Sequence, residues 1–109
     1  MALVLDRRVV STAQAGDVLD AVVLVSRSRV ARRVLQVLGR HGRLATKPLL
    51  RLVNGAPSNT GYDVLRRLVE LGLVKRYSGR NDANIPVVWN EITPLGRRVL
   101  EIVESMEEG

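Results

Sequence analysis

Cysteine and phenylalanine are absent from this chain of 109 residues, and histidine occurs once. Without cysteine the chain can form neither a disulfide framework nor a thiolate metal site. The single histidine, His41, has no second imidazole with which to share a metal ion, and we expect it to be a polar residue at a helix end. The sequence therefore predicts no metal and no other cofactor, and it fits a reducing, cytoplasmic setting.

Aromatic side chains are nearly missing as well, since Tyr62, Tyr77 and Trp89 are the three in the chain. Proteins that read single-stranded RNA stack bases on several aromatic side chains, so that class is disfavoured. Few other side chains could supply volume to a hairpin. We therefore expect Trp89 to pack in a hairpin core and not to offer a stacking surface.

Long apolar runs and catalytic motifs are also missing. The longest apolar run near the start, Ala21 to Val25, is far shorter than the roughly 18 residues of a membrane span. Arg7 and Arg8 follow the first apolar residues and precede no long apolar stretch, which does not predict a signal peptide. There is no Gly-rich phosphate loop with Lys and Ser/Thr, no His-Glu-x-x-His, and no nucleophile with a base and an orienting acid. We expect neither a membrane protein nor an enzyme.

Acidic residues are scarce in the middle of the chain, where basic residues are abundant. Residues 27–80 hold thirteen Lys or Arg against Asp63 and Glu70, a net charge of +11, although the whole chain carries only +6. A basic surface of this kind suits a polyanionic partner. Arg-rich surfaces also occur in heat-adapted proteins as ion-pair networks, but such networks need acids, and this segment has few.

The chain has 46% hydrophobic residues, enough for one domain with a real core. Residues 3–10 fit either a strand or a helical arm. Asp17 can cap a short helix that runs to about Val25, and Ser28 offers a new cap. An apolar stripe at helical spacing then predicts the strongest helix of the first half, which ends near His41 and leads into a minimal strand.

Two short helices are expected next. Thr46 can cap the first, with Pro48 in its first turn, where a missing N–H costs nothing. Its buried side is expected to consist of Leu49, Leu50, Leu52 and Val53. A turn over residues 54–57 leads to a second helix that Ser58 caps and Gly72 ends. Two short helices joined by a tight turn predict a helix-turn-helix.

The second of these helices has one small or apolar face, and its polar residues lie elsewhere on its surface. The inward face comprises Gly61, Val64, Leu65, Leu68 and Leu71. Residues 73–78 and 87–92 then predict a hairpin with a polar loop between them. Thr93 caps a final helix whose first position is Pro94. On that helix, apolar residues step by four, three and four and predict a seam for another helix: Leu95, Val99, Ile102 and Met106.

This order of elements resembles that of the winged helix-turn-helix transcription regulators. Val25 to Leu38 is similar to their first scaffold helix, and Val64 to Val74 to the end of a recognition helix that enters a wing. The stretch Ile-Thr-Pro-Leu-Gly-Arg at 92–97 resembles the Leu-Thr-x-x-Gly-Arg that often leads into the C-terminal helix. From about Val18 to Val103, the chain resembles the MarR, ArsR and PadR-like groups and their archaeal relatives.

The resemblance implies a mainly α fold with a small β-hairpin (α+β), a winged helix-turn-helix with flanking N- and C-terminal helices. An arm or short helix would occupy residues 1–26, the winged helix-turn-helix 27–93 and the last helix 94–109. The implied function is a sequence-specific double-stranded DNA-binding transcription regulator or a DNA-associated architectural factor. Its recognition helix, about 58–71, would enter the major groove, and its wing, about 73–92, would touch the backbone or minor groove. The alternative is a protein-interaction module that docks an acidic partner in a larger assembly.

The residues expected at the DNA are polar residues of the recognition helix, cations of the wing and one lysine before the turn. They are Asn59, Thr60, Tyr62, Asp63, Arg66, Arg67, Lys75, Arg76, Arg80 and Lys47. Arg66 and Arg67 suit the paired acceptors of guanine, although Asp63 and Glu70 are spaced to pair with them instead. Tyr62 fits a base contact and packing at the helix edge equally well. The wing cations suit phosphate or the minor groove, with a solvated hairpin as the alternative.

Two further expectations concern packing. Gly61 stands where the resembling families often have a small aliphatic residue. A glycine at this position lowers the local helix propensity by about 1 kcal/mol. It either allows close approach of the supporting helix or leaves the first turn to order on DNA. The stripe Leu95, Val99, Ile102 and Met106 is expected to form a homodimer interface that sets two recognition helices roughly 34 Å apart. Alternatively, four residues of the same chain would cover it: Val18, Leu19, Val22 and Val23.

Overall fold

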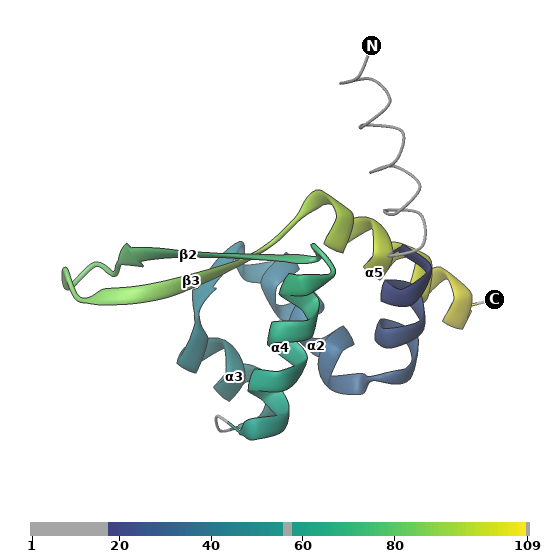
Figure 1. Cartoon of the computed structure of the whole chain (residues 1–109), viewed down its shortest axis with the longest axis horizontal. Coiled ribbons are helices and arrows are strands. Elements are labelled where there is room, and N and C mark those ends of the chain that lie inside the picture. Colours follow the sequence, from purple (N-terminus) through teal and green to yellow (C-terminus); the bar gives the residue numbers. More distant parts are fainter. Residues whose placement is uncertain (1–17, 56–57, 109) are drawn as a thin grey trace, which may run out of the picture.

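The computed structural model describes residues 18–55 and 58–108, and the expectations for residues 3–10 and for Asp17 lie outside this part (Figure 1). An initial helix over residues 18–27 comes first. It is followed by α2 (Arg29–His41), β1 (Arg43–Ala45), α3 (Thr46–Asn54), α4 (Asn59–Glu70), β2 (Val74–Arg80), β3 (Pro86–Ile92) and α5 (Pro94–Glu108). The described part is mainly α with a small sheet, which confirms the predicted fold class.

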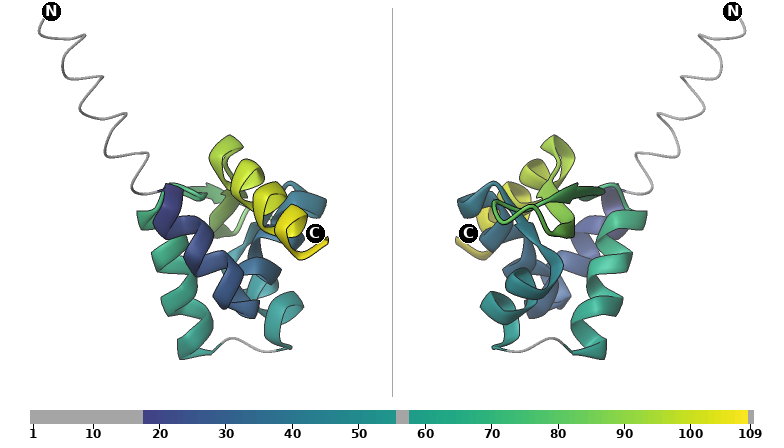
Figure 2. Two further views of the ribbon diagram at one scale, coloured as in Figure 1. Left: turned by 90° about the vertical axis from the view of Figure 1, so that its right-hand side faces the viewer. Right: turned by 90° about the vertical axis from the view of Figure 1, so that its left-hand side faces the viewer.

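The sheet has three antiparallel strands in the order β1-β3-β2. Asn90 of β3 lies opposite Leu44 of β1 on one side and opposite Arg76 of β2 on the other. Both hairpin strands have seven residues, so the loop between them, 81–85, is shorter than the predicted 79–86. The hairpin projects from the helices as a wing (Figure 1). In both side-on views, α3 and α4 lie on one side of the wing and the first turns of α5 on the other (Figure 2).

Local capping interactions set most helix ends where the sequence predicts them. The hydroxyls of Ser28 and Ser58 accept from the backbone N–H groups three residues later, at 3.1 and 3.0 Å, and Thr93 does the same at 3.0 Å. Gly72 ends α4 in the left-handed region, with φ of 77°. The N–H of Leu73 bonds to the carbonyl of Leu68 at 2.9 Å, which completes a Schellman motif.

Two expectations for α3 are wrong. Ala45 occupies the N-cap position without a side-chain cap, because β1 runs straight into the helix and Thr46 is already its first residue. The Thr46 hydroxyl instead accepts from a side chain of the sheet. Leu52 is 47% exposed, because the inward face of this short helix is occupied by Leu49 and Leu50.

One core connects all the helices with the sheet. It includes Ala21 and Val25 of the initial helix, Leu65 of α4 and Ile92 of β3. The centre is α2, which packs against α3, α4, α5 and β3 and buries five residues: Ala31, Val34, Leu35, Val37 and Leu38. The predicted apolar stripe on this helix therefore faces the core. No helix of the described residues combines the length and apolar character that crossing a membrane requires.

The predicted stripe on α5 does not form one surface. Val99 is fully buried within the chain, together with Val103, so the prediction of Val99 as an interface residue is wrong. Leu95 is half-buried against the core, whereas Ile102 and Met106 are 36% and 59% exposed. The inward face of α5 follows the spacing of four from Val99 to Val103. Ile102 and Met106 therefore lie on a side of the helix that is turned outward. The alternative prediction, that four residues of the initial helix cover this stripe, is also wrong for two of them, since Leu19 and Val23 are exposed.

Gly96 allows α5 to lie directly on the start of the wing. A Cβ at this position would meet the backbone oxygen of Leu73 and would lie 2.8 Å from Cγ1 of Ile92. Gly39, which also lies in a helix, has room, since the nearest atom to its added Cβ is Nη1 of Arg97 at 3.9 Å.

We therefore expect Gly96→Ala to lower the free energy of unfolding by about 2 kcal/mol or more, because backbone must move. Gly39→Ala is the matched control and should raise it by about 1 kcal/mol through helix propensity. Urea unfolding of both variants measures the difference. Equal stability of Gly96→Ala and the unaltered protein would contradict the close approach of α5.

Candidate functional site

A groove of about 670 Å³ lies between the wing and the helix-turn-helix. Its walls come from β1 and the first turns of α3, from Tyr62 of α4, and from both strands of the hairpin. Three cations line it, Lys47, Arg51 and Arg76, and the described lining includes no acid. Two of these cations were predicted as site residues, and Arg51 was not. The spacing of four between Lys47 and Arg51 was the available signal, because it places both on one helix face.

The outer surface of α4 borders this groove. Asn59, Thr60, Asp63, Arg66 and Arg67 are all exposed, and Tyr62 is 37% exposed. Arg66 lies one helical turn after Tyr62, so both project from the side of α4 that borders the groove. The structure thus brings most of the predicted α4 residues onto one accessible surface.

Ion pairs on α4 are weak. Nη1 of Arg66 lies 3.9 Å from Oδ1 of Asp63, and both side chains are 70% exposed. Nη1 of Arg67 lies 3.4 Å from Oε2 of Glu70, with both side chains about half exposed. Exposed pairs of this kind contribute about 0.5 kcal/mol, so either arginine can exchange its acid for another partner at little cost.

The start of α4 is packed closely on α3. A Cβ at Gly61 would lie 3.1 Å from Cδ2 of Leu50, so a larger residue would press on the supporting helix. Ser58 accepts the N–H of Gly61 and orders the first turn without any ligand. Of the two interpretations of Gly61, close approach of the supporting helix agrees with this geometry.

The three predicted wing cations do not share one surface. Arg76 lines the groove, and its Nη2 donates to Oγ1 of Thr46 at 3.3 Å. Lys75 projects from the opposite face of the strand, where Nζ lies 3.9 Å from Oε2 of Glu91. Arg80 donates from Nη1 to the backbone oxygen of Asn84 at 2.9 Å, which ties together the base and tip of the loop.

The outer face of the wing carries a packed aromatic cluster. The guanidinium of Arg43 lies 4.2 Å from the centre of the Trp89 ring, and a Cβ at Gly79 would come within 2.6 Å of the same indole. The Tyr77 hydroxyl accepts from Arg43 at 3.3 Å and donates to Glu91 at 2.9 Å. Trp89 packs within the hairpin only half-buried and is not part of the buried core; Arg43 lies over one face of its ring, and the residue also lines the groove.

Asn90 is the buried polar residue that the sequence reasoning missed. It is fully buried in the central strand, and it is the one polar or charged residue of the described part in that class. Its Nδ2 donates to the carbonyl of Leu44 at 3.1 Å and to Oγ1 of Thr46 at 3.0 Å. The signal was an asparagine within a strand rich in β-branched residues, where this residue type is depleted.

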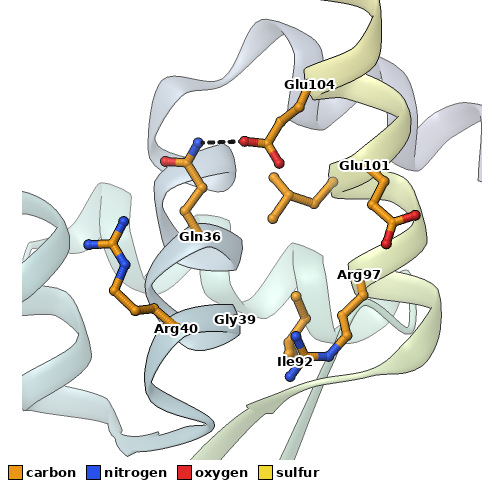
Figure 3. A pocket seen from close by; sticks show the side chains of 8 residues that line it. Gln36, Gly39, Arg40, Ile92, Arg97, Glu101 and Glu104 are labelled. Carbon is orange, nitrogen blue, oxygen red and sulfur yellow. Dashed lines mark hydrogen bonds between the residues drawn. The ribbon is translucent and has the colours of Figure 1, made fainter.

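Other cations lie outside the groove. The α2 residues Arg29, Arg33 and Arg40 are exposed and are not part of its lining. A smaller hollow of about 390 Å³ is lined by residues of α2 and α5, and there Gln36 donates to Glu104 at 3.5 Å (Figure 3). Arg40 points away from α5 in this view, and the hollow mixes acids with cations. It lacks the single sign of charge that distinguishes the groove.

His41 is exposed at the end of α2. Within residues 18–55 and 58–108, no three or more His, Cys, Asp or Glu side chains form a group that could hold a metal ion. The groups that the groove offers to a ligand are therefore its cations, the polar side chains of α4 beside it and its apolar walls.

No protein-family model matches the chain, and no curated protein does. Solved structures match instead. The protein ytfH from Salmonella typhimurium, described as a transcriptional regulator, is 28% identical over 79% of this chain and 75% of its own, with a TM-score of 0.61. A MarR-family transcriptional regulator from Silicibacter pomeroyi is 23% identical over 96% of this chain and 68% of its own, with a TM-score of 0.58.

A third match is a regulator of the MarR family from Enterococcus faecalis, 27% identical over 68% of this chain and 64% of its own, with a TM-score of 0.56. The predicted resemblance to winged helix-turn-helix regulators is confirmed by these structures. The matched proteins are described as transcriptional regulators, which are not enzymes.

Proposed function

We propose that this chain, whose fold is that of the MarR-family winged-helix regulators, binds double-stranded DNA and regulates transcription. One observation carries the proposal: among the described residues, three cations and no acid line the groove between the wing and the helix-turn-helix, directly beside the exposed face of α4. Such a groove suits the sugar–phosphate backbone of a duplex that α4 enters from the major-groove side.

Each part of the surface has a different role in this proposal. The first turns of α4, with Asn59, Thr60 and Tyr62, meet base edges, since recognition helices read bases near their N-termini. Asp63 accepts from cytosine amino groups, whereas Arg66 donates to guanine. Cations outside the base-reading surface hold phosphates: Lys47, Arg51, Arg67, Arg76, and at the rim of the wing Lys75 and Arg80.

A second candidate function is docking of an acidic protein partner in a larger assembly. The same groove supports it, because the cations of the groove suit carboxylates as well as phosphates. The two functions differ in one measurable property: the first requires affinity for duplex DNA that weakens steeply with salt, and the second does not.

Affinity for duplex DNA should fall steeply with salt. Neutralising roughly four or more phosphates per chain gives a log-log slope steeper than about −3.5, since each releases about 0.9 of a counterion. Fluorescence anisotropy with a labelled duplex measures the slope. Arg51→Ala should make it shallower by about 0.9, whereas the matched control Arg29→Ala, on α2 outside the groove, should leave it unchanged. No duplex binding at low salt, or a flat response, would exclude the DNA proposal and favour the acidic partner.

Base reading should separate two adjacent arginines. Arg66→Ala should cost about 1 to 3 kcal/mol on a preferred site and relax the preference at one base pair. Arg67→Ala, whose side chain pairs with Glu70, removes the same charge and should weaken preferred and random duplexes alike. Competition between a selected site and random duplex measures both. Equal losses on the two duplexes for Arg66→Ala would reduce Arg66 to a backbone contact.

We also propose a homodimer formed by the terminal helices. Leu19, Val23, Ile102 and Met106 are exposed large apolar residues. The pair in each helix is spaced by four, so each forms a short apolar ridge, and clustered exposed apolar residues mark interfaces. The initial helix and the end of α5 lie opposite the wing tip (Figure 1). The acids of this end of α5, Glu101, Glu104 and Glu107, are compatible with a surface that faces another protein.

Ile102→Glu tests the dimer. Because Ile102 is 36% exposed, the variant should stay folded but become monomeric in sedimentation, and it should bind a palindromic duplex at least about 100-fold more weakly. Leu52→Glu adds the same charge at an exposed leucine of α3 and should leave the sedimentation unchanged. A monomeric unaltered protein at micromolar concentration would overturn the dimer.

A further inference from the structure

Asn90 is fully buried in the central strand, a position where an apolar residue would be expected. Its Oδ1 is buried and has no hydrogen-bond partner in the described structure. An unpartnered buried carbonyl is destabilising, so the amide is not explained by the stability of the fold alone. Its contacts suggest another role.

The amide belongs to a short polar chain that joins the wing to the helix-turn-helix. Nδ2 of Asn90 donates to Oγ1 of Thr46 at 3.0 Å and to the carbonyl of Leu44 at 3.1 Å. The same Thr46 oxygen accepts from Nη2 of Arg76 at 3.3 Å. Since Thr46 is the first residue of α3, its hydroxyl connects β3, α3 and β2 at one point. The chain ends on a cation of the groove.

We propose that Asn90 and Thr46 are positioning residues, which hold the guanidinium of Arg76 in the groove before DNA arrives. This inference rests on the proposed function and names how one phosphate contact of that site is prepared. An exposed arginine that binds a phosphate must give up rotamer freedom. Arg76 already lies within hydrogen-bonding distance of a hydroxyl that the buried amide orients, so part of that entropy is lost on folding and not on binding.

The two flanking wing cations differ from Arg76 in this respect. Lys75 lies on the outer face beside Glu91, and Arg80 is bonded to the loop backbone at Asn84. Arg76 is directed toward α3 because it is the cross-strand neighbour of Asn90. Its place in the sheet therefore puts the guanidinium next to the hydroxyl that the amide holds.

A double-mutant cycle on duplex affinity tests the proposal. Thr46→Val removes the hydroxyl with little change of shape and should weaken binding about five-fold, the effect of one freed arginine side chain. Thr46→Ser keeps a hydroxyl and should restore most of the affinity. Because Thr46 acts through Arg76, the double variant Thr46→Val with Arg76→Ala should bind as Arg76→Ala alone does.

Asn90→Leu provides a second readout that a purely structural residue would not give. It removes the buried unpartnered oxygen, so the melting temperature should stay within about 5 °C of the unaltered protein or rise, while duplex affinity falls. If Asn90 had a purely structural role, Asn90→Leu would instead lower the melting temperature and the duplex affinity together. That result would overturn the positioning role of Asn90.

The remaining outcomes separate this inference from the proposed function. If the unaltered protein binds duplex and Thr46→Val binds equally well, the positioning role is overturned and DNA binding stands. Additive losses in the double variant would mean that Thr46 contacts DNA itself, which also overturns it. Absence of duplex binding by the unaltered protein at low salt would overturn the proposed function and this inference together.

Discussion

The pairing of β1 with β3 is the interaction on which the rest of the site depends. β1 has three residues and runs without a loop into α3, so its register with β3 also sets where α3 begins. The hairpin is thereby attached to the helix-turn-helix by β3, the central strand of the sheet. The Asn90 amide lies at this junction inside the sheet, where its Nδ2 donates to the carbonyl of Leu44 and the hydroxyl of Thr46.

Basic and acidic side chains lie on different parts of this fold. Cations distant in the sequence, Lys47 and Arg51 on α3 and Arg76 on β2, meet in the groove without an acid among its described lining. The acids of α5 are not part of the groove lining, and one of them, Glu107, pairs with Arg32 of α2 at 2.6 Å. This arrangement explains how a chain with a net charge of only +6 can present one strongly basic surface.

The two parts of the site differ in their order before binding. The wing is braced on its outer face by Arg43 over Trp89 and by the Tyr77 hydroxyl between Arg43 and Glu91. The side chains of α4 extend into solvent with weak ion pairs, and they lose rotamer freedom when they meet a ligand. A rigid wing with adaptable helix side chains suits a surface that holds a uniform backbone and reads variable edges.

The sequence by itself determined the fold class and most helix ends, the start of α3 excepted. Ser28, Ser58 and Thr93 cap helices through hydrogen bonds that close within three residues, so a local pattern was sufficient. Only the tertiary structure decided the roles of Thr46 and Asn90, which meet across 44 positions of the chain. It also decided which apolar residues of α5 face inward, because one helical position is about 100° of rotation and the packed neighbours select the angle. Periodicity indicates that an apolar face exists, whereas contacts between distant segments choose its direction.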